Sequence, residues 1–91
     1  MIIVQGPGSE SLGSSVANLL GLEKVSVNYK TFPDGEVYLC LSRDVKDKDA
    51  VIIHSTGPPQ NERFIQLFLL IDACRDMGMR TIRVVTPYLA Y

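Results

Sequence analysis

The stretch "AVIIHSTGPPQNERFIQLFLLIDACRDM" (residues 50–77) decides the fold. It begins with an apolar run, residues 50–55, that has the length and composition of a buried strand. The loop at residues 56–60 contains Gly-Pro-Pro, which is typical of a turn. Residues 61–77 then have the length and composition of a helix. A buried strand followed by a helix is the repeating piece of a parallel sheet, so this stretch predicts an α/β protein.

The rest of the chain supplies the other elements of such a fold. Residues 2–5, "IIVQ", form a β-branched run, and residues 9–20 have helical spacing of leucine and valine, with Gly21 as a C-terminal cap. Alternating runs at residues 25–30 and 37–41 and a final strand at 82–86 complete the order β-α-β-β-β-α-β. This order predicts a three-layer α/β/α domain with a mostly parallel sheet.

Two of these strands are joined by a turn with an unusual composition. Pro33, Asp34 and Gly35 favour a tight turn, so residues 25–41 predict a protruding β-hairpin with an exposed tip. The ring of Phe32 has a face on which a flat base can stack, and Asp34 and Glu36 can accept hydrogens from an exocyclic amino group. These three residues are therefore the candidate binding residues for adenine. The alternative is a solvated acidic tip with Phe32 tucked inward, which composition alone favours.

Composition excludes several other classes of function. The chain has 91 residues, 46% of them hydrophobic and 21% charged, and a formal net charge of −1. It lacks the basic excess of a general nucleic-acid-binding protein. No apolar run approaches the roughly 20 residues of a membrane span. The N-terminus, "MIIVQGPGSE", has no basic segment and long apolar core like those of a signal peptide, so we expect a cytoplasmic protein.

Cysteine and histidine are too few to predict a metal site. Cys40 and Cys74 each lie in an apolar run, where we expect buried, reduced thiols. With no CxxC motif and a single histidine, no zinc site is expected. His54 ends an apolar strand, where a structural role is favoured over a site contact. No catalytic residue is assigned.

Two further segments can be interpreted either as purely structural or as functional. "GPGSE" (6–10) is similar to a phosphate-binding loop, but it is neither GxGxxG nor a P-loop, so a plain strand-to-helix turn is favoured. The helix at 61–77 is apolar nearly all round, which is consistent with burial inside one domain or against another subunit. Asn61 and Glu62 suit the start of that helix without any functional role.

Two motifs connect the chain to a known family. "FPDGEVY" (32–38) and "PYLAY" (87–91) closely resemble the F-[PS]-[DN]-[GN]-E-x-Y and P-Y-x-x-Y segments of ribose-phosphate pyrophosphokinase, also called phosphoribosyl pyrophosphate (PRPP) synthetase. "GPGSESLGSSVANLLG" (6–21) and "GPPQNERFIQLFLLIDACR" (57–75) also fit segments of that family. The resemblance spans the whole chain.

This resemblance implies a fold, a reaction and a set of partners. Members transfer diphosphate from ATP to ribose 5-phosphate with Mg²⁺, giving PRPP and AMP, and they work as oligomers of chains with two phosphoribosyltransferase-like domains. The hairpin at 32–36 would be the flag loop, which reaches the ATP site of a neighbouring subunit. Phe32 would stack near the adenine, while Asp34 and Glu36 would receive its amino group.

The chain departs from the family where the chemistry would lie. In the family the second motif continues as A-R-Q-D, whereas this chain ends at Tyr91. The chain also lacks the family's catalytic histidine, its Lys/Arg loop and its ribose-phosphate loop. We therefore expect residues 1–91 to be an incomplete N-terminal domain, inactive alone. The competing hypotheses are a non-catalytic regulatory relative and a stand-alone nucleotide-binding module.

Overall fold

A computed structural model describes residues 1–89 of the chain, with the backbone alone at Val37. The elements are β1 (Ile2–Gln5), α1 (Glu10–Leu20), β2 (Glu23–Thr31), β3 (Val37–Leu41), β4 (Asp49–Ile53), α2 (Gln60–Asp76) and β5 (Thr81–Val85). The order of elements predicted from the sequence is confirmed, with boundaries that differ by one or two residues.

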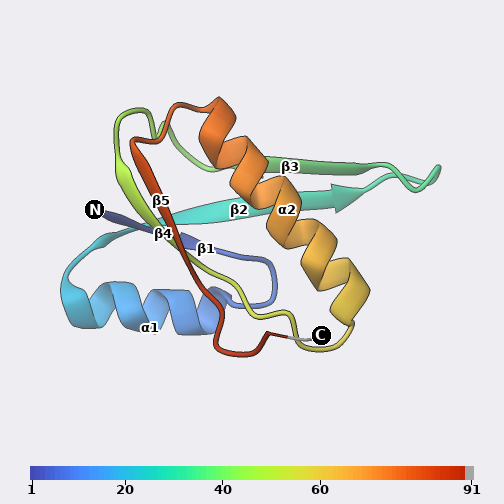
Figure 1. The fold of residues 1–91 in the computed structure, drawn as a ribbon, viewed down its shortest axis with the longest axis horizontal. Helices are drawn as coiled ribbons and strands as arrows, with labels where there is room; N and C mark the ends of the chain where they lie inside the picture. The colour runs from blue at the N-terminus through green and yellow to red at the C-terminus, as the bar shows by residue number, and fades with distance from the viewer. Residues whose placement is uncertain (90–91) are drawn as a thin grey trace.

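The five strands form one sheet in the order β3-β2-β1-β4-β5. β1 pairs in parallel with β2 and β4, β4 pairs in parallel with β5, and only β3 is antiparallel to its neighbour. α1 and α2 lie on opposite faces of this sheet (Figure 1). The predicted three-layer, mostly parallel α/β fold is therefore confirmed. α1 leads outward from β1 to β2, whereas α2 leads the other way from β4 to β5, so the topology reverses between β1 and β4.

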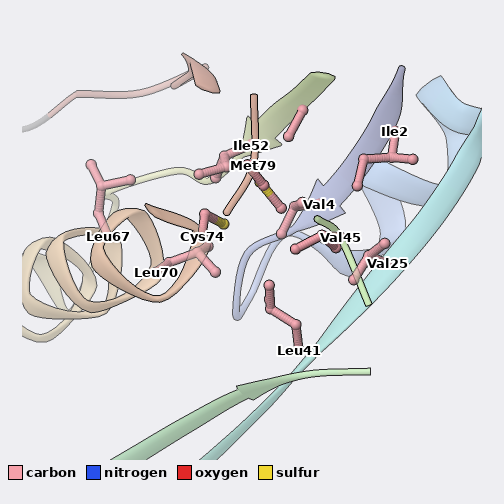
Figure 2. Close-up of a cluster of buried hydrophobic side chains, with 11 residues drawn as sticks. Ile2, Val4, Val25, Leu41, Val45, Ile52, Leu67, Leu70, Cys74 and Met79 are labelled. Atoms are coloured by element: carbon pink, nitrogen blue, oxygen red, sulfur yellow. The ribbon is translucent and has the colours of Figure 1, made fainter. Parts of the chain in front are cut away.

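The main core lies between the sheet and α2, and Figure 2 shows its side chains converging from β1, β2, β3 and β4, from the segments just before β4 and β5, and from α2. Alternate residues of each buried strand enter this core because successive side chains of a strand point to opposite faces. A smaller cluster lies under α1, from Ile3, Ala17 and Ile53. β1 is buried on both faces, which explains the apolar run at residues 2–4.

The end of α1 agrees with the sequence prediction, whereas the start of α2 differs from it by one residue. α1 ends as predicted at Gly21, which adopts a left-handed conformation while the N–H of Leu22 donates to the oxygen of Ala17 at 2.9 Å. For α2 the expected start was displaced by one residue. Pro59 is the N-terminal cap residue and Asn61 lies inside the first turn, because the proline ring already has the φ of a helix entrance.

One expectation about the cysteines was wrong. Cys74 is buried in the main core as expected, but Cys40 is exposed. Leu39 and Leu41 point to the core side of β3, so the alternation of the strand places Cys40 on the opposite face. That face of the hairpin also carries Asn28, which pairs with Cys40 across the two strands.

Candidate functional site: the tip of the β2–β3 hairpin

The hairpin is supported by the core at its base and leaves it toward the tip. Val25 and Leu41, near the base, are buried, whereas Thr31 near the tip is exposed. In Figure 1 the turn that joins the two strands extends past both helices, and it lies at the far right end of the molecule. The sequence-predicted protruding hairpin is thus present.

The backbone of the tip is a tight turn followed by a bulge. The N–H of Gly35 donates to the oxygen of Phe32 at 2.9 Å, and the N–H of Phe32 donates to the oxygen of Glu36 at 2.8 Å. Gly35 has a φ of 90°, a left-handed conformation that side-chain-bearing residues seldom adopt. Pro33 stiffens the first half of the turn, so the backbone carrying Phe32 and Glu36 is held in one shape.

The three sequence-predicted residues lie together at this tip and point away from the core. Phe32 keeps 47% of its surface exposed, and Asp34 and Glu36 are exposed. The alternative in which Phe32 is tucked inward is therefore wrong. Among residues 1–89 neither carboxylate forms an ion pair, in contrast to the surface pairs Arg43–Glu23 and Arg80–Asp49. Their role in binding a base stays a prediction.

The strand register assigns the tip side chains to faces of the hairpin. Lys30 pairs with Tyr38 and Thr31 with Val37. Phe32 and Glu36 follow as the next facing positions, so by alternation they project on the face that carries Lys30 and Tyr38. An aromatic ring and a carboxylate thus share one side of an exposed tip.

A second group of loops meets at the carboxyl edge of β1 and β4. The N–H of Ser55 donates to the Oγ of Ser9 at 3.0 Å, which joins the two loops. Arg63, from the first turn of α2, donates through Nη1 to the oxygen of Pro7 at 2.9 Å and to Oε1 of Gln66 at 2.9 Å. The "GPGSE" segment is thus held by hydrogen bonds within the protein, which supports its interpretation as a plain strand-to-helix turn.

His54 belongs to this junction, and its side chain is packed inside the protein rather than exposed to a ligand. It is fully buried, its Nε2 lies 2.8 Å from the oxygen of Arg63, and its Nδ1 has no hydrogen-bond partner in the described part of the chain. Nδ1 faces Gly6 so closely that any side chain there would overlap it. Burial lowers the pKa of His54, which favours the neutral ring. The structural interpretation of this histidine is supported.

Residues 1–89 offer no metal centre of their own. In this range no three histidine, cysteine, aspartate or glutamate side chains gather in a way that would hold a metal ion. Over the same range, neither helix has the length and apolarity needed to span a bilayer.

Sequence reasoning overlooked one feature of these sites, Arg63, because only the fold brings it against the loop after β1. The side-chain hydrogen bond typical of an aspartate in such a turn is present: the N–H of Glu36 donates to Oδ1 of Asp34, with 3.0 Å between the nitrogen and the oxygen. Ala90 and Tyr91, in the second motif, lie outside the described residues.

The fold defines the class of protein to which the chain is similar. It superposes on the crystal structure of phosphoribosylpyrophosphate synthetase from Mycobacterium smegmatis with a TM-score of 0.84 at 22% identity, covering 94% of this chain and 29% of that one. It also superposes on purine phosphoribosyltransferase from Pyrococcus horikoshii with a TM-score of 0.70 at 18% identity, covering 99% of this chain and 64% of that one. These likenesses establish a fold shared with phosphoribosyltransferase-type proteins.

The sequence comparison then assigns the family. The family described as the N-terminal domain of ribose phosphate pyrophosphokinase matches residues 1–91, and the chain belongs to it. The ribose-phosphate pyrophosphokinase of Saccharolobus solfataricus is 34% identical over 91 residues, which are 100% of this chain and 31% of that protein. The chain therefore spans less than a third of the length of that relative.

Proposed function

We propose that the chain is part of an enzyme that transfers diphosphate from ATP to ribose 5-phosphate. In that reaction the 1-hydroxyl oxygen of the sugar attacks the β-phosphorus of ATP, the bond from the α,β-bridging oxygen to the β-phosphorus breaks, AMP leaves, and PRPP forms. Residues 1–91 constitute an incomplete N-terminal domain that contributes adenine recognition and subunit contacts. The observation that carries the proposal is the whole-chain family match together with the exposed hairpin tip.

Adenine recognition is assigned to the three residues at the tip. Phe32 stacks on the base, and the carboxylates of Asp34 and Glu36 face its amino group. Because the tip projects away from its own core, a nucleotide held there is closed over by another part of the enzyme, which we take to be a neighbouring subunit. The exposed Ile65 and Phe68 of α2 support a homo-oligomer, since an apolar helix face of this kind is favourable only when covered.

Mg²⁺ belongs to this proposal as a companion of ATP. The described residues gather no set of metal ligands, so the ion would be held chiefly by the nucleotide phosphates and by groups outside this chain. When bound, it would neutralise phosphate charge during the transfer. The cytoplasmic location stays a prediction from the N-terminal sequence.

The test is an assay of PRPP formation from ATP and ribose 5-phosphate by the natural polypeptide that contains this chain, beside calorimetry of ATP against residues 1–91. We expect the natural polypeptide to form PRPP and AMP in equal amounts, and residues 1–91 alone to show no micromolar binding of ATP. A natural polypeptide that binds its partners but never forms PRPP would instead indicate a regulatory relative. Micromolar ATP binding by monomeric residues 1–91 would indicate a stand-alone module.

A further inference from the structure

The side chain of His54 lies between two segments that are far apart in the sequence. The residue directly follows β4, and its N–H donates to the oxygen of Val85 in β5 at 3.1 Å. Its fully buried ring lies between the loop after β1 and the first turn of α2, because Nδ1 faces Gly6 and Nε2 lies 2.8 Å from the oxygen of Arg63. The ring therefore links that loop to that helix.

The side chain of Arg63 connects the same two elements a second time. Its Nη1 donates to the oxygen of Pro7 at 2.9 Å, and a Cβ on Gly8 would lie 2.6 Å from the guanidinium carbon. The loop at residues 6–8 is therefore held against α2 by two side chains, those of His54 and Arg63. Both contacts lie at the carboxyl edge of β1 and β4, where the topology reverses and where open α/β sheets place their ligand-binding loops.

The neighbours of the His54 ring determine which of its nitrogens carries the proton. A backbone carbonyl only accepts hydrogen bonds, so Nε2 must donate to the oxygen of Arg63. Nδ1 is then unprotonated in the neutral ring, and it has no hydrogen-bond partner in the described part of the chain. A second proton would make Nδ1 a buried, charged donor that faces Gly6 without an acceptor, which is a costly arrangement.

Burial is the main influence on the pKa of His54, and it lowers this pKa. The oxygen of Arg63 favours the protonated ring as a hydrogen-bond acceptor, whereas the guanidinium of the same residue, on α2, opposes it. The carboxylate of Glu10, on α1, favours the protonated ring. The loop after β1 and β5 meet His54 through uncharged residues, Gly6 and Val85. The ring is therefore neutral near pH 7 and takes up a proton only below about pH 6.5.

We propose that His54 is a proton-operated latch: its neutral ring holds the loop at residues 6–8 against the first turn of α2, and a second proton on the ring releases that loop. The charged ring needs water or another acceptor at Nδ1, and it gains one only when the loop and the helix move apart. Acid therefore loosens this edge of the sheet before it unfolds the domain. The opposite edge, where the N–H of Asp47 donates to the oxygen of Gly78 at 2.8 Å, takes no part. The latch does not depend on the reaction proposed above.

The experiment measures hydrogen–deuterium exchange of the natural polypeptide by mass spectrometry. Exchange is followed at several pH values between about 7.5 and about 5, and each rate is divided by that of an unstructured peptide at the same pH. The reporting segments are residues 6–9 and 55–63, which form the junction. The control segment is residues 45–49 at the opposite edge of the sheet.

Two variants are compared with the unmodified protein. His54→Gln keeps an N–H donor for the oxygen of Arg63 but has no proton to gain. Glu10→Gln removes the negative charge that favours the protonated ring, and it keeps an oxygen acceptor for the N–H of Gly8. The second variant alters an exposed side chain and leaves the buried ring in place.

We expect both junction segments of the unmodified protein to exchange about tenfold faster at about pH 5 than at about pH 7.5, since a buried charged donor without a partner favours the open form. The control segment should change by less than about twofold. In His54→Gln the junction should exchange at the same corrected rate at every pH. In Glu10→Gln the pH at which exchange accelerates should fall by a few tenths of a unit, as expected for the loss of one exposed charge.

Three results would overturn the latch. Equal acceleration of the junction and control segments would mean that the whole domain loosens, and no acceleration at the junction would mean that the protonated ring is tolerated. Full acceleration in His54→Gln would mean that another group titrates. If His54→Gln does not fold, the midpoint in Glu10→Gln decides: a lower midpoint supports the latch, and an unchanged midpoint overturns it.

Discussion

Substitution of Gly6 by alanine should destabilise the junction between the β1 and β4 loops. A Cβ at this position would lie 2.3 Å from Nδ1 of His54 and 2.7 Å from its Cβ, well inside the 3.4 Å at which ordinary contact begins. The ring cannot move aside freely, because it is fully buried and its Nε2 is bound to the oxygen of Arg63 at 2.8 Å. Nor can Gly6 retreat easily, since its N–H donates to the oxygen of Ile53 at 2.9 Å.

The expected cost combines overpacking with the weakening of one buried hydrogen bond. Overpacking of a filled interior costs about 1–3 kcal/mol, and the hydrogen bond contributes about 1 kcal/mol, so we expect Gly6→Ala to lower the free energy of unfolding by about 2–4 kcal/mol. That is a large share of the roughly 5–15 kcal/mol by which domains are stable. Urea unfolding of residues 1–91, followed by circular dichroism, measures the difference.

Gly57→Ala is the matched control on the neighbouring loop. A Cβ there would meet only Ser55 and Tyr88, both at 3.8 Å, which is ordinary contact. We expect this variant to stay within about 0.5 kcal/mol of the unmodified chain. The packing argument would be refuted if Gly6→Ala were as stable as Gly57→Ala.

Three further predictions concern titratable groups. A thiol reagent should modify Cys40 in the folded chain but modify Cys74 only on unfolding, because burial shields Cys74 and raises the pKa of its thiol to about 11; equal rates would contradict the placement. Hydrogen bonds from Arg80 and Thr81 hold the pKa of Asp49 well below its usual range, so this carboxylate stabilises the fold above about pH 4, and the stabilisation is lost as the pH falls further. Melting temperatures of Asp49→Asn and the unmodified chain should therefore converge in acid. His54 is neutral in the fold because burial lowers its pKa. The contribution of the neutral ring to the stability of the fold is therefore present above about pH 6.5, and it is lost as the pH falls toward the pKa of the folded state. Ring resonances of this single histidine should titrate with a midpoint below pH 6.5.

Local sequence patterns were sufficient to predict the elements and the class of fold. The strand at residues 2–5, the Gly21 cap and the hairpin turn each follow from residue types close together in the chain. The position of the site followed from the same kind of pattern, because Pro33 and Gly35 make the tip and Phe32 borders it.

What the sequence could not predict depends on contacts between distant segments or on burial. Whether Phe32 lies in the core or in solvent depends on which face of the hairpin packs against α2, and no local pattern encodes that. Cys40 lies in an apolar run, yet its side of β3 is the one that faces away from the core. Arg63 reaches a loop more than fifty residues away. Each of these required the assembled sheet.

The same limit applies to the interface question for α2. An all-round apolar helix is compatible with a buried or a docking helix, and the sequence leaves both open. The structure buries one face through Leu67, Leu70 and Cys74 and leaves Ile65 and Phe68 exposed. Both alternatives therefore remain open for the exposed face of α2.

The central claim is that the hairpin tip grips the base of ATP, and Phe32→Ala tests it most directly. In the free protein the ring contributes little to the fold, because about half of its surface is exposed. Leu19→Ala, at an exposed position of α1, serves as the control for a general loss of apolar surface. The measurement is the calorimetric Kd of the natural polypeptide for ATP. We predict that Phe32→Ala weakens binding by about 1–3 kcal/mol, the scale of one base–aromatic stack, while Leu19→Ala leaves the Kd unchanged. An ATP affinity that is the same with and without the Phe32 ring would contradict the account.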